Sequence, residues 1–175
     1  MLNTKIDFTK ISLMDALDLA ILIEQEAEER YKSFCDLLGS AYKGDAADFF
    51  NMMAVNEAKH GKELSSRRAK LFPNIPSRVN IDMIDDIEAP DYGAPRSFMS
   101  PRAALEVAMS SEIKAEKFFA AALEYIKDPQ IRELFAELRD EEIEHQNLLK
   151  AQIEKVGTEL GPDVDSEDVD TAAGD

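Results

Sequence analysis

The chain has 175 residues, of which 45% are hydrophobic and 32% are charged, and its formal net charge at pH 7 is −16. This length suits a single domain with its own core, and the negative charge argues against nucleic acid and anionic lipid, because both select clustered Lys and Arg. Cys35 is the only cysteine, which excludes an internal disulfide, a zinc ribbon and a rubredoxin-like iron site.

No segment is predicted to enter a membrane or to direct export. The longest apolar run, near residues 13–23, is interrupted by Asp15 and Asp18. Residues 1–24 also lack the basic start, uninterrupted apolar centre and small-residue cleavage site of a secretory leader. We therefore expect a cytoplasmic protein.

Four long segments are predicted to be helices, because each begins with a typical helix-start pattern. These starts are Ser12 followed by Asp15, Asp45 after Gly44, Ser100-Pro101 and Asp128-Pro129. The expected helices span about 12–38, 45–71, 100–126 and 128–156, with boundary errors of about two to four residues.

The segments outside these helices define the expected domain organisation. Residues 72–99 contain four prolines and no sustained helical period, so they are predicted to cross over between two helical hairpins. Residues 157–175 contain seven Asp or Glu and no Lys or Arg, which predicts a solvated, disordered tail. We therefore expect an all-α, antiparallel four-helix bundle over residues 1–156.

The chain also repeats itself. Residues 16–31 align with 104–119, and residues 49–60 align with 134–145. The alignment pairs four ionisable residues with a residue of the same type: Glu24 with Glu112, Glu28 with Glu116, Glu57 with Glu142, and His60 with His145. All but the second of these pairs lie on the core-facing side. Two copies of one helical hairpin are therefore predicted.

These six paired residues lie at positions where a bundle helix normally carries apolar side chains. Spacings of three and four residues place Glu24, Glu57, His60, Glu112, Glu142 and His145 on the core-facing side of their helices. The four glutamates follow Ser12, Asp45, Ser100 and Asp128 by 12, 12, 12 and 14 residues, or about 18–21 Å along each helix. In antiparallel hairpins, all four carboxylates should therefore meet at mid-height.

A buried group of four carboxylates requires compensation. Without it, each ion costs several kcal/mol or takes up a proton. Two divalent cations supply the matching charge, and a Glu-x-x-His pair offers one bridging carboxylate and one terminal imidazole from the same helix face. Oxygen and nitrogen donors without thiolate favour iron or manganese. A solvated charged face could explain one of these glutamates, but not six residues at core positions and at one level.

At this point the sequence resembles the ferritin-like superfamily, whose di-iron members use this same set of four Glu and two His. Within it, the pattern E-x-x-A-x-x-x-Y at Glu24, Ala27 and Tyr31 looks most like the first helix of rubrerythrins. The resemblance covers about residues 12–156 and implies a non-haem centre of two iron ions, with manganese or zinc as substitutes. It also implies that Tyr31 donates a hydrogen bond to a ligand carboxylate; the alternative is a core aromatic.

The sequence departs from the rubrerythrin pattern in ways that change these implications. A rubredoxin domain is absent, so electrons would come from an external donor protein. Ala115 stands where rubrerythrins carry an extra Glu, which leaves a symmetric ligand set closer to bacterioferritin. Glu28 and Glu116 could approach the site, although exposed charge is the simpler role. Ala58 occupies the position of the haem-binding Met of bacterioferritin, so no haem is expected.

Three functions remain open from the sequence. The first is an oxidoreductase that reduces hydrogen peroxide or dioxygen, using its di-metal centre as the catalytic group and an external donor as the electron source. The second is a ferroxidase or iron-handling protein. The third is a non-catalytic metal-binding scaffold whose acidic tail engages a partner. A homodimer is expected, because ferritin-like bundles commonly pair along helix faces.

Overall fold

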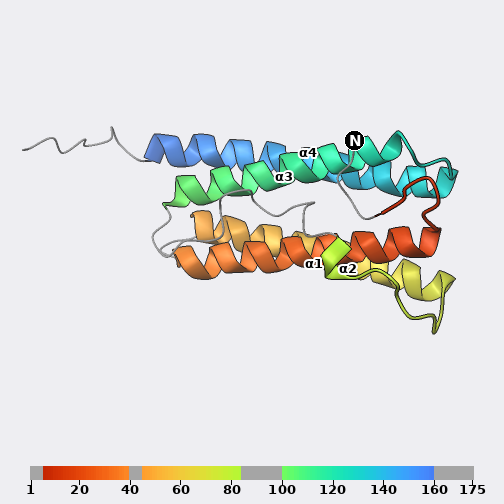
Figure 1. The fold of residues 1–175 in the computed structure, drawn as a ribbon. Coiled ribbons are helices and arrows are strands. Elements are labelled where there is room, and N and C mark those ends of the chain that lie inside the picture. Colours follow the sequence, from red (N-terminus) through yellow and green to blue (C-terminus); the bar gives the residue numbers. More distant parts are fainter. Residues whose placement is uncertain (1–5, 40–44, 84–99, 160–175) are drawn as a thin grey trace, which may run out of the picture.

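The computed structural model describes residues 6–39, 45–83 and 100–159. Four helices dominate this part of the chain: α1 (Leu13–Leu38), α2 (Ala46–Leu71), α3 (Pro101–Leu123) and α4 (Pro129–Glu159). The two members of each hairpin, α1 with α2 and α3 with α4, run antiparallel and pack closely along their lengths (Figure 1). The prediction of an all-α four-helix bundle is confirmed.

The helix starts agree with the sequence because the predicted caps are formed. The side chains of Ser12, Asp45 and Ser100 accept hydrogen bonds from the backbone N–H three residues later, at 3.1, 2.9 and 3.1 Å. Asp128 accepts from the N–H of Gln130 at 2.8 Å and of Ile131 at 3.2 Å. Each cap satisfies donors that the first helical turn leaves without intrahelical partners.

Two helix ends differ by three residues from the predicted positions, within the expected boundary error. α3 ends at Leu123 rather than near residue 126, since the chain tightens into a turn in which Tyr125 N–H donates to Ala122 O at 3.0 Å. The guanidinium of Arg132 then donates to the carbonyls of Leu123 and Ile126, which holds this turn against the start of α4. α4 continues to Glu159, so residues 157–159 belong to the helix and not to the expected tail.

Gly157 did not end α4, because an interior Gly weakens a helix by only about 1 kcal/mol. Residues 160–175 of the predicted tail, and residues 84–99 of the predicted crossover, lie outside the described residues. The described part of the crossover contains one short 3-10 turn, η1 (Ile81–Met83).

Arg68 anchors the beginning of the crossover, a role that the sequence did not suggest. Its Nε and Nη2 donate to the two carboxylate oxygens of Asp18 on α1, at 2.6 and 3.2 Å. Nη1 also donates to Phe72 O at 2.6 Å, and Nη2 to Ile75 O at 2.8 Å. One buried side chain therefore joins α1 to the end of α2 and to the segment that follows.

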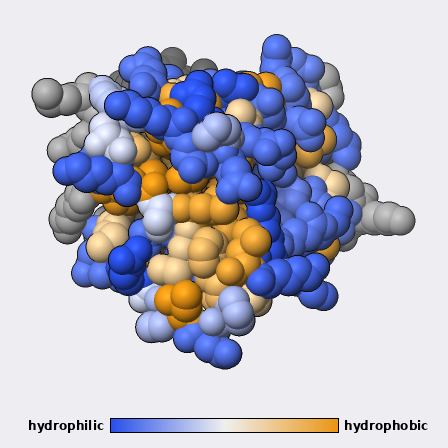
Figure 2. Space-filling view, turned by 90° about the vertical axis from the view of Figure 1, so that its right-hand side faces the viewer, coloured by the Kyte–Doolittle hydropathy of each residue, from blue (hydrophilic) through white to orange (hydrophobic). Residues whose placement is uncertain are grey.

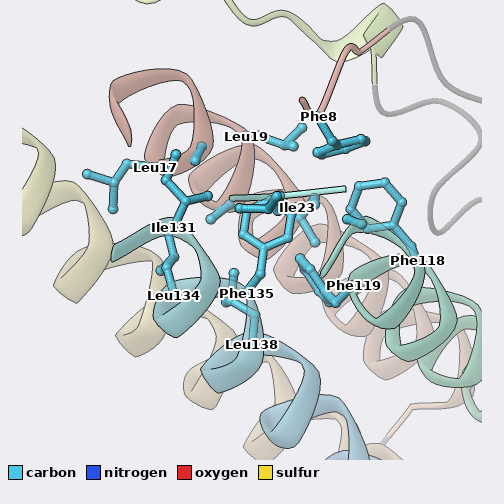
Figure 3. Close-up of a cluster of buried hydrophobic side chains, with 14 of the residues drawn as sticks. Phe8, Leu17, Leu19, Ile23, Phe118, Phe119, Ile131, Leu134, Phe135 and Leu138 are labelled. Atoms are coloured by element: carbon cyan, nitrogen blue, oxygen red, sulfur yellow. The ribbon is translucent and has the colours of Figure 1, made fainter. Parts of the chain in front are cut away.

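The apolar core is divided into two clusters. The first lies where α1 and α4 begin and α3 ends, and it includes Phe8 from the segment before α1 (Figure 3). The ring of Phe8 meets Phe118 and Phe135 edge to face, with centroids 5.6 and 6.0 Å apart. The second cluster, at the other end of the bundle, contains Tyr31, Phe34 and Phe50. The buried Glu24, Glu57, Glu112, Glu142 and His145 lie at the level between the two clusters.

One end of the bundle combines hydrophilic and apolar surface. Figure 2 shows the end where α1 and α4 begin, with hydrophilic side chains surrounding an apolar area. Among the residues that the structure describes, no helix combines the length and the apolar character that crossing a bilayer requires.

Candidate metal centre

The four predicted glutamates are buried at the middle of the bundle, and each comes from a different helix. The exposed fractions are 4% for Glu24, 3% for Glu57, 3% for Glu112 and 6% for Glu142. The carboxyl group of Glu24 lies beside that of Glu57, and the carboxyl group of Glu112 lies beside that of Glu142, close enough to affect each other's pKa. The carboxylates therefore form a close group, as expected from their equal depth along the four helices.

The two histidines complete this group. His145 places Nδ1 3.2 Å from Glu57 Oε1 and 3.5 Å from Glu112 Oε2. His60 places Nδ1 3.8 Å from Glu24 Oε2 and 4.0 Å from Glu57 Oε2. The imidazole rings lie nearly parallel, with centroids 6.0 Å apart. The structure thus brings together all six residues that the sequence selected.

Glu57 has a central position in this arrangement. Its Oε1 faces His145, and its Oε2 faces His60. A carboxylate whose two oxygens point to two different imidazoles is suited to bridge two ions, each held at the far side by one histidine.

Three groups of donor atoms could each hold a metal ion, with all atoms of a group within 4.8 Å of one another. They are Glu57, His60 and His145; Glu24, His60 and Glu141; and Glu112, Glu142 and His145. Glu28 and Glu116 belong to none of these groups among the described residues. Instead Glu28 forms an ion pair with Lys32, and Glu116 accepts a hydrogen bond from Gln146 at 3.4 Å.

Glu141 is the one donor that the sequence missed. It lies one residue before Glu142, off the strict three-and-four spacing, and its carboxylate Oε2 is 3.7 Å from His60 Nδ1. The signal available in the sequence was the adjacent pair of glutamates before Ile143. Periodicity alone assigns Glu141 to the flank of α4 and not to its buried face. The contact with His60 becomes visible only when α2 is placed beside α4.

The hydrogen bonding of this group supports a cation-binding role. In the described part of the chain, Glu24 Oε2, His60 Nδ1 and His145 Nδ1 are buried atoms without a hydrogen-bond partner. Buried polar atoms are normally satisfied, since an unmet group costs about 1–3 kcal/mol. Here these atoms face one another, so the donor set fits divalent cations placed among them.

The buried carboxylates differ in their affinity for protons. Burial raises the pKa of Glu24 to about 7, and the nearby charge of Glu141 adds to this effect. Burial also acts to raise the pKa of Glu112, but the neighbouring Glu142 and His145 and the hydrogen bond from Tyr31 outweigh it and lower the pKa to about 2. Without cations, Glu24 on α1 therefore holds a proton more readily than Glu112 on α3.

The histidines are shifted in opposite directions. Burial, followed by the charge of His145, lowers the pKa of His60. For His145, burial acts to lower the pKa, but Glu112, whose Oε2 is 3.5 Å from Nδ1, and the surrounding carboxylates outweigh it and raise the pKa. Metal binding requires both imidazoles to be neutral, so a cation displaces a proton most clearly from the His145 side.

Tyr31 supports the α3 side of the group. Its side chain is fully buried, and its hydroxyl donates a hydrogen bond to Glu112 Oε1. The ring stacks on Phe50, with centroids 5.9 Å apart. Burial and the charge of Glu112 raise the pKa of Tyr31 well above its ordinary value, so the hydroxyl keeps its proton and remains a donor.

Comparison with known proteins agrees with the fold. The chain matches the family model described as Rubrerythrin over residues 15–91 and 103–173. A crystal structure of an uncharacterized conserved protein from Magnetospirillum magnetotacticum is 28% identical, with a TM-score of 0.70 over 83% of this chain and 95% of that one.

A hypothetical protein from Pyrococcus furiosus shares the fold, with 22% identity and a TM-score of 0.61 over 87% of this chain and 94% of that one. No protein with a curated description matches significantly. Because the family model covers most of the sequence and both hairpins, the chain belongs to the rubrerythrin family.

Proposed function

We propose that the centre holds two iron ions and that the protein reduces hydrogen peroxide or dioxygen with electrons from an external donor. The observation that carries this proposal is the position of Glu57, whose two oxygens face the two histidines in the middle of a carboxylate group. Oxygen and nitrogen donors without thiolate favour iron or manganese, with zinc as a substitute.

Each residue of the proposed centre has a distinct role. His60 and His145 would hold one ion each, and Glu57 would bridge the ions. Glu24 would complete the His60 side, while Glu112 and Glu142 would complete the His145 side, as their positions in the donor groups indicate. Tyr31 would keep Glu112 oriented through its hydrogen bond.

When bound, two iron ions supply two electrons by changing between their ferrous and ferric states. Reduction of one hydrogen peroxide to two waters consumes two electrons and two protons, so a two-electron store matches this oxidant. The chain itself limits access: apolar clusters lie on both sides of the group along the bundle. A cavity of about 170 Å³ beside His60 and Glu141 offers a route for a small oxidant.

Stopped-flow mixing of the anaerobic, ferrous-loaded protein with peroxide, and separately with dioxygen, tests the function. We expect fast oxidation by at least one of them, followed by repeated cycles when a reductant is supplied. Oxidation that releases ferric iron, without return to the starting state, would favour a ferroxidase. A loaded centre that is inert to both oxidants would favour a structural metal site.

The role of Tyr31 gives a second prediction. Tyr31→Phe removes the hydroxyl that donates to Glu112 but keeps the ring that stacks on Phe50. Loss of a partner that orients a metal ligand typically weakens binding about 10- to 100-fold. We expect this change in titrations with Fe²⁺ under anaerobic conditions, and none for Tyr125→Phe, since Tyr125 is 40% exposed. Equal affinity in the two variants would leave Tyr31 as a core aromatic only.

A further inference from the structure

The two halves of the centre are not equivalent, although the sequence repeat predicts that they are. The side chain of His145 is 7% exposed, whereas that of its counterpart His60 is 23% exposed. The cavity of about 170 Å³ lies on the His60 side, between α2 and α4. One of the two ion positions therefore lies nearer to solvent.

Glu141 stands at the boundary between this cavity and the buried group. It lines the cavity, and its Oε2 lies 3.7 Å from His60 Nδ1. Its carboxylate also belongs to the donor group formed with Glu24 and His60. In the repeat, the residue that corresponds to Glu141 is Asn56, so the His145 side has no equivalent carboxylate.

Independent support comes from Glu24. Its side chain is 4% exposed, and its Oε2 has no hydrogen-bond partner among the described residues. That oxygen points to the same place as Glu141, since it lies 3.8 Å from His60 Nδ1. Three groups converge here: a deeply buried carboxylate oxygen, an imidazole nitrogen and a second carboxylate. No hydrogen-bond donor of a described residue lies between them, so together they form a cation site.

We infer that Glu141 is a seventh ligand, which binds only the ion beside His60. This inference rests on the proposed two-ion centre and makes that centre asymmetric. The ion at His145 is held by deeply buried donors, and the ion at His60 is held partly by a carboxylate that reaches in from the cavity wall. The cavity also carries Glu63, Glu137 and Arg67. With Glu141, its acidic side chains outnumber the one guanidinium, and this negative charge attracts cations towards the second position.

Equilibrium titration with Mn²⁺ tests this assignment without any measurement of activity. Wild type is expected to bind two ions, and the spin-coupled electron paramagnetic resonance signal should report their proximity. Glu141→Gln keeps the size of the side chain but loses the charge; it should bind the first ion normally and the second about 10- to 100-fold more weakly. A simple six-line spectrum of an isolated Mn²⁺ should then appear at a ratio of one ion per chain.

Glu144→Gln is the matched control. Glu144 is an exposed glutamate one turn further along α4, so its substitution removes the same charge without removing a donor. Two ions bound equally tightly by Glu141→Gln and Glu144→Gln would overturn the inference while leaving the two-ion centre intact. If wild type itself bound no pair of ions, the proposed centre would fail, so the two failures are distinguishable.

A double-mutant comparison assigns the affected ion. If Glu141 binds only the His60 ion, Glu141→Gln should not change the affinity of the ion that remains at His145 in a His60→Ala background. In a His145→Ala background, it should weaken the ion that remains at His60. A weaker His145 ion in the first background would contradict the assignment of Glu141 to the His60 side.

Discussion

Glu57→Gln is expected to abolish binding of both ions. Glu57 is 3% exposed, and its two oxygens face the two histidines, so replacement by an amide removes the bridge and leaves an N–H₂ group directed at one cation. After anaerobic loading with Fe²⁺ and desalting, we expect about two iron per chain in wild type and close to none in the variant. Glu142→Gln should also lose iron, first from the His145 side.

The control for this experiment is Glu106→Gln on α3. Glu106 forms an exposed pair with Arg102, with a separation of 3.0 Å, and lies outside the donor groups. It should retain the wild-type iron content. Circular dichroism should show that the variant is folded. If folded Glu57→Gln also retained two ions, Glu57 would not bridge them, and its charge would not be needed to balance theirs.

The metal-free protein is expected to lose stability as the pH rises from about 4.5 to about 7. Burial raises the pKa of Glu24 from its ordinary value of 4.5 to about 7 in the folded state. The folded state therefore binds this proton more tightly than the unfolded state does. Its stabilising effect is complete below pH 4.5 and disappears as the pH rises through about 7, a loss of about 3 kcal/mol.

The other shifted groups act in separate or smaller ways. Glu112 has a lowered pKa, so its contribution is present above pH 4.5 and is lost as the pH falls towards about 2. The raised pKa of His145 adds to the loss above pH 6.5. The lowered pKa of His60 acts below pH 6.5, where it makes the protein more stable as the pH rises. Between pH 4.5 and pH 6, the raised pKa values of Glu24 and Glu141 lower the stability, and His60 opposes them.

Chemical denaturation of the metal-free protein across this range provides the measurement. Glu24→Gln should flatten the slope, whereas Glu106→Gln should leave it unchanged. The metal-loaded protein should show the opposite trend, because ions bind the deprotonated ligands and stabilise the fold by about 2.7 kcal/mol for each ion at a hundredfold excess over its Kd. If the metal-free protein became more stable as the pH rose to 7, the raised pKa of Glu24 in the folded state would be contradicted.

Much of the fold could be predicted because its determinants are local. The capping residues Ser12, Asp45, Ser100 and Asp128 mark helix starts through hydrogen bonds to residues two or three positions away. The apolar spacing then assigns each helix a buried face. The helix ends were harder to predict, since α3 stops where Arg132 of the next helix holds the turn.

The candidate site was selected by the sequence for a similar reason. Glutamates and histidines at apolar positions, repeated in two hairpins and at equal depth, are visible without coordinates. Whether these six residues bind iron is a separate question, which the loading experiments address. The same pattern could not include Glu141, because its contact with His60 depends on how α4 lies beside α2.

By itself, the sequence determined the four helices, their buried faces, the rubrerythrin resemblance and the identity of six meeting side chains. Only the tertiary structure decided that His60 is more exposed than His145 and that Glu141 joins one side. It also decided that Phe8 packs on Phe118 of α3 and Phe135 of α4, and that Arg68 joins the end of α2 to Asp18 of α1. The physical reason is the range of the interactions. Helix periodicity and capping act within a few residues, whereas these contacts depend on the relative placement of segments that are distant in the chain.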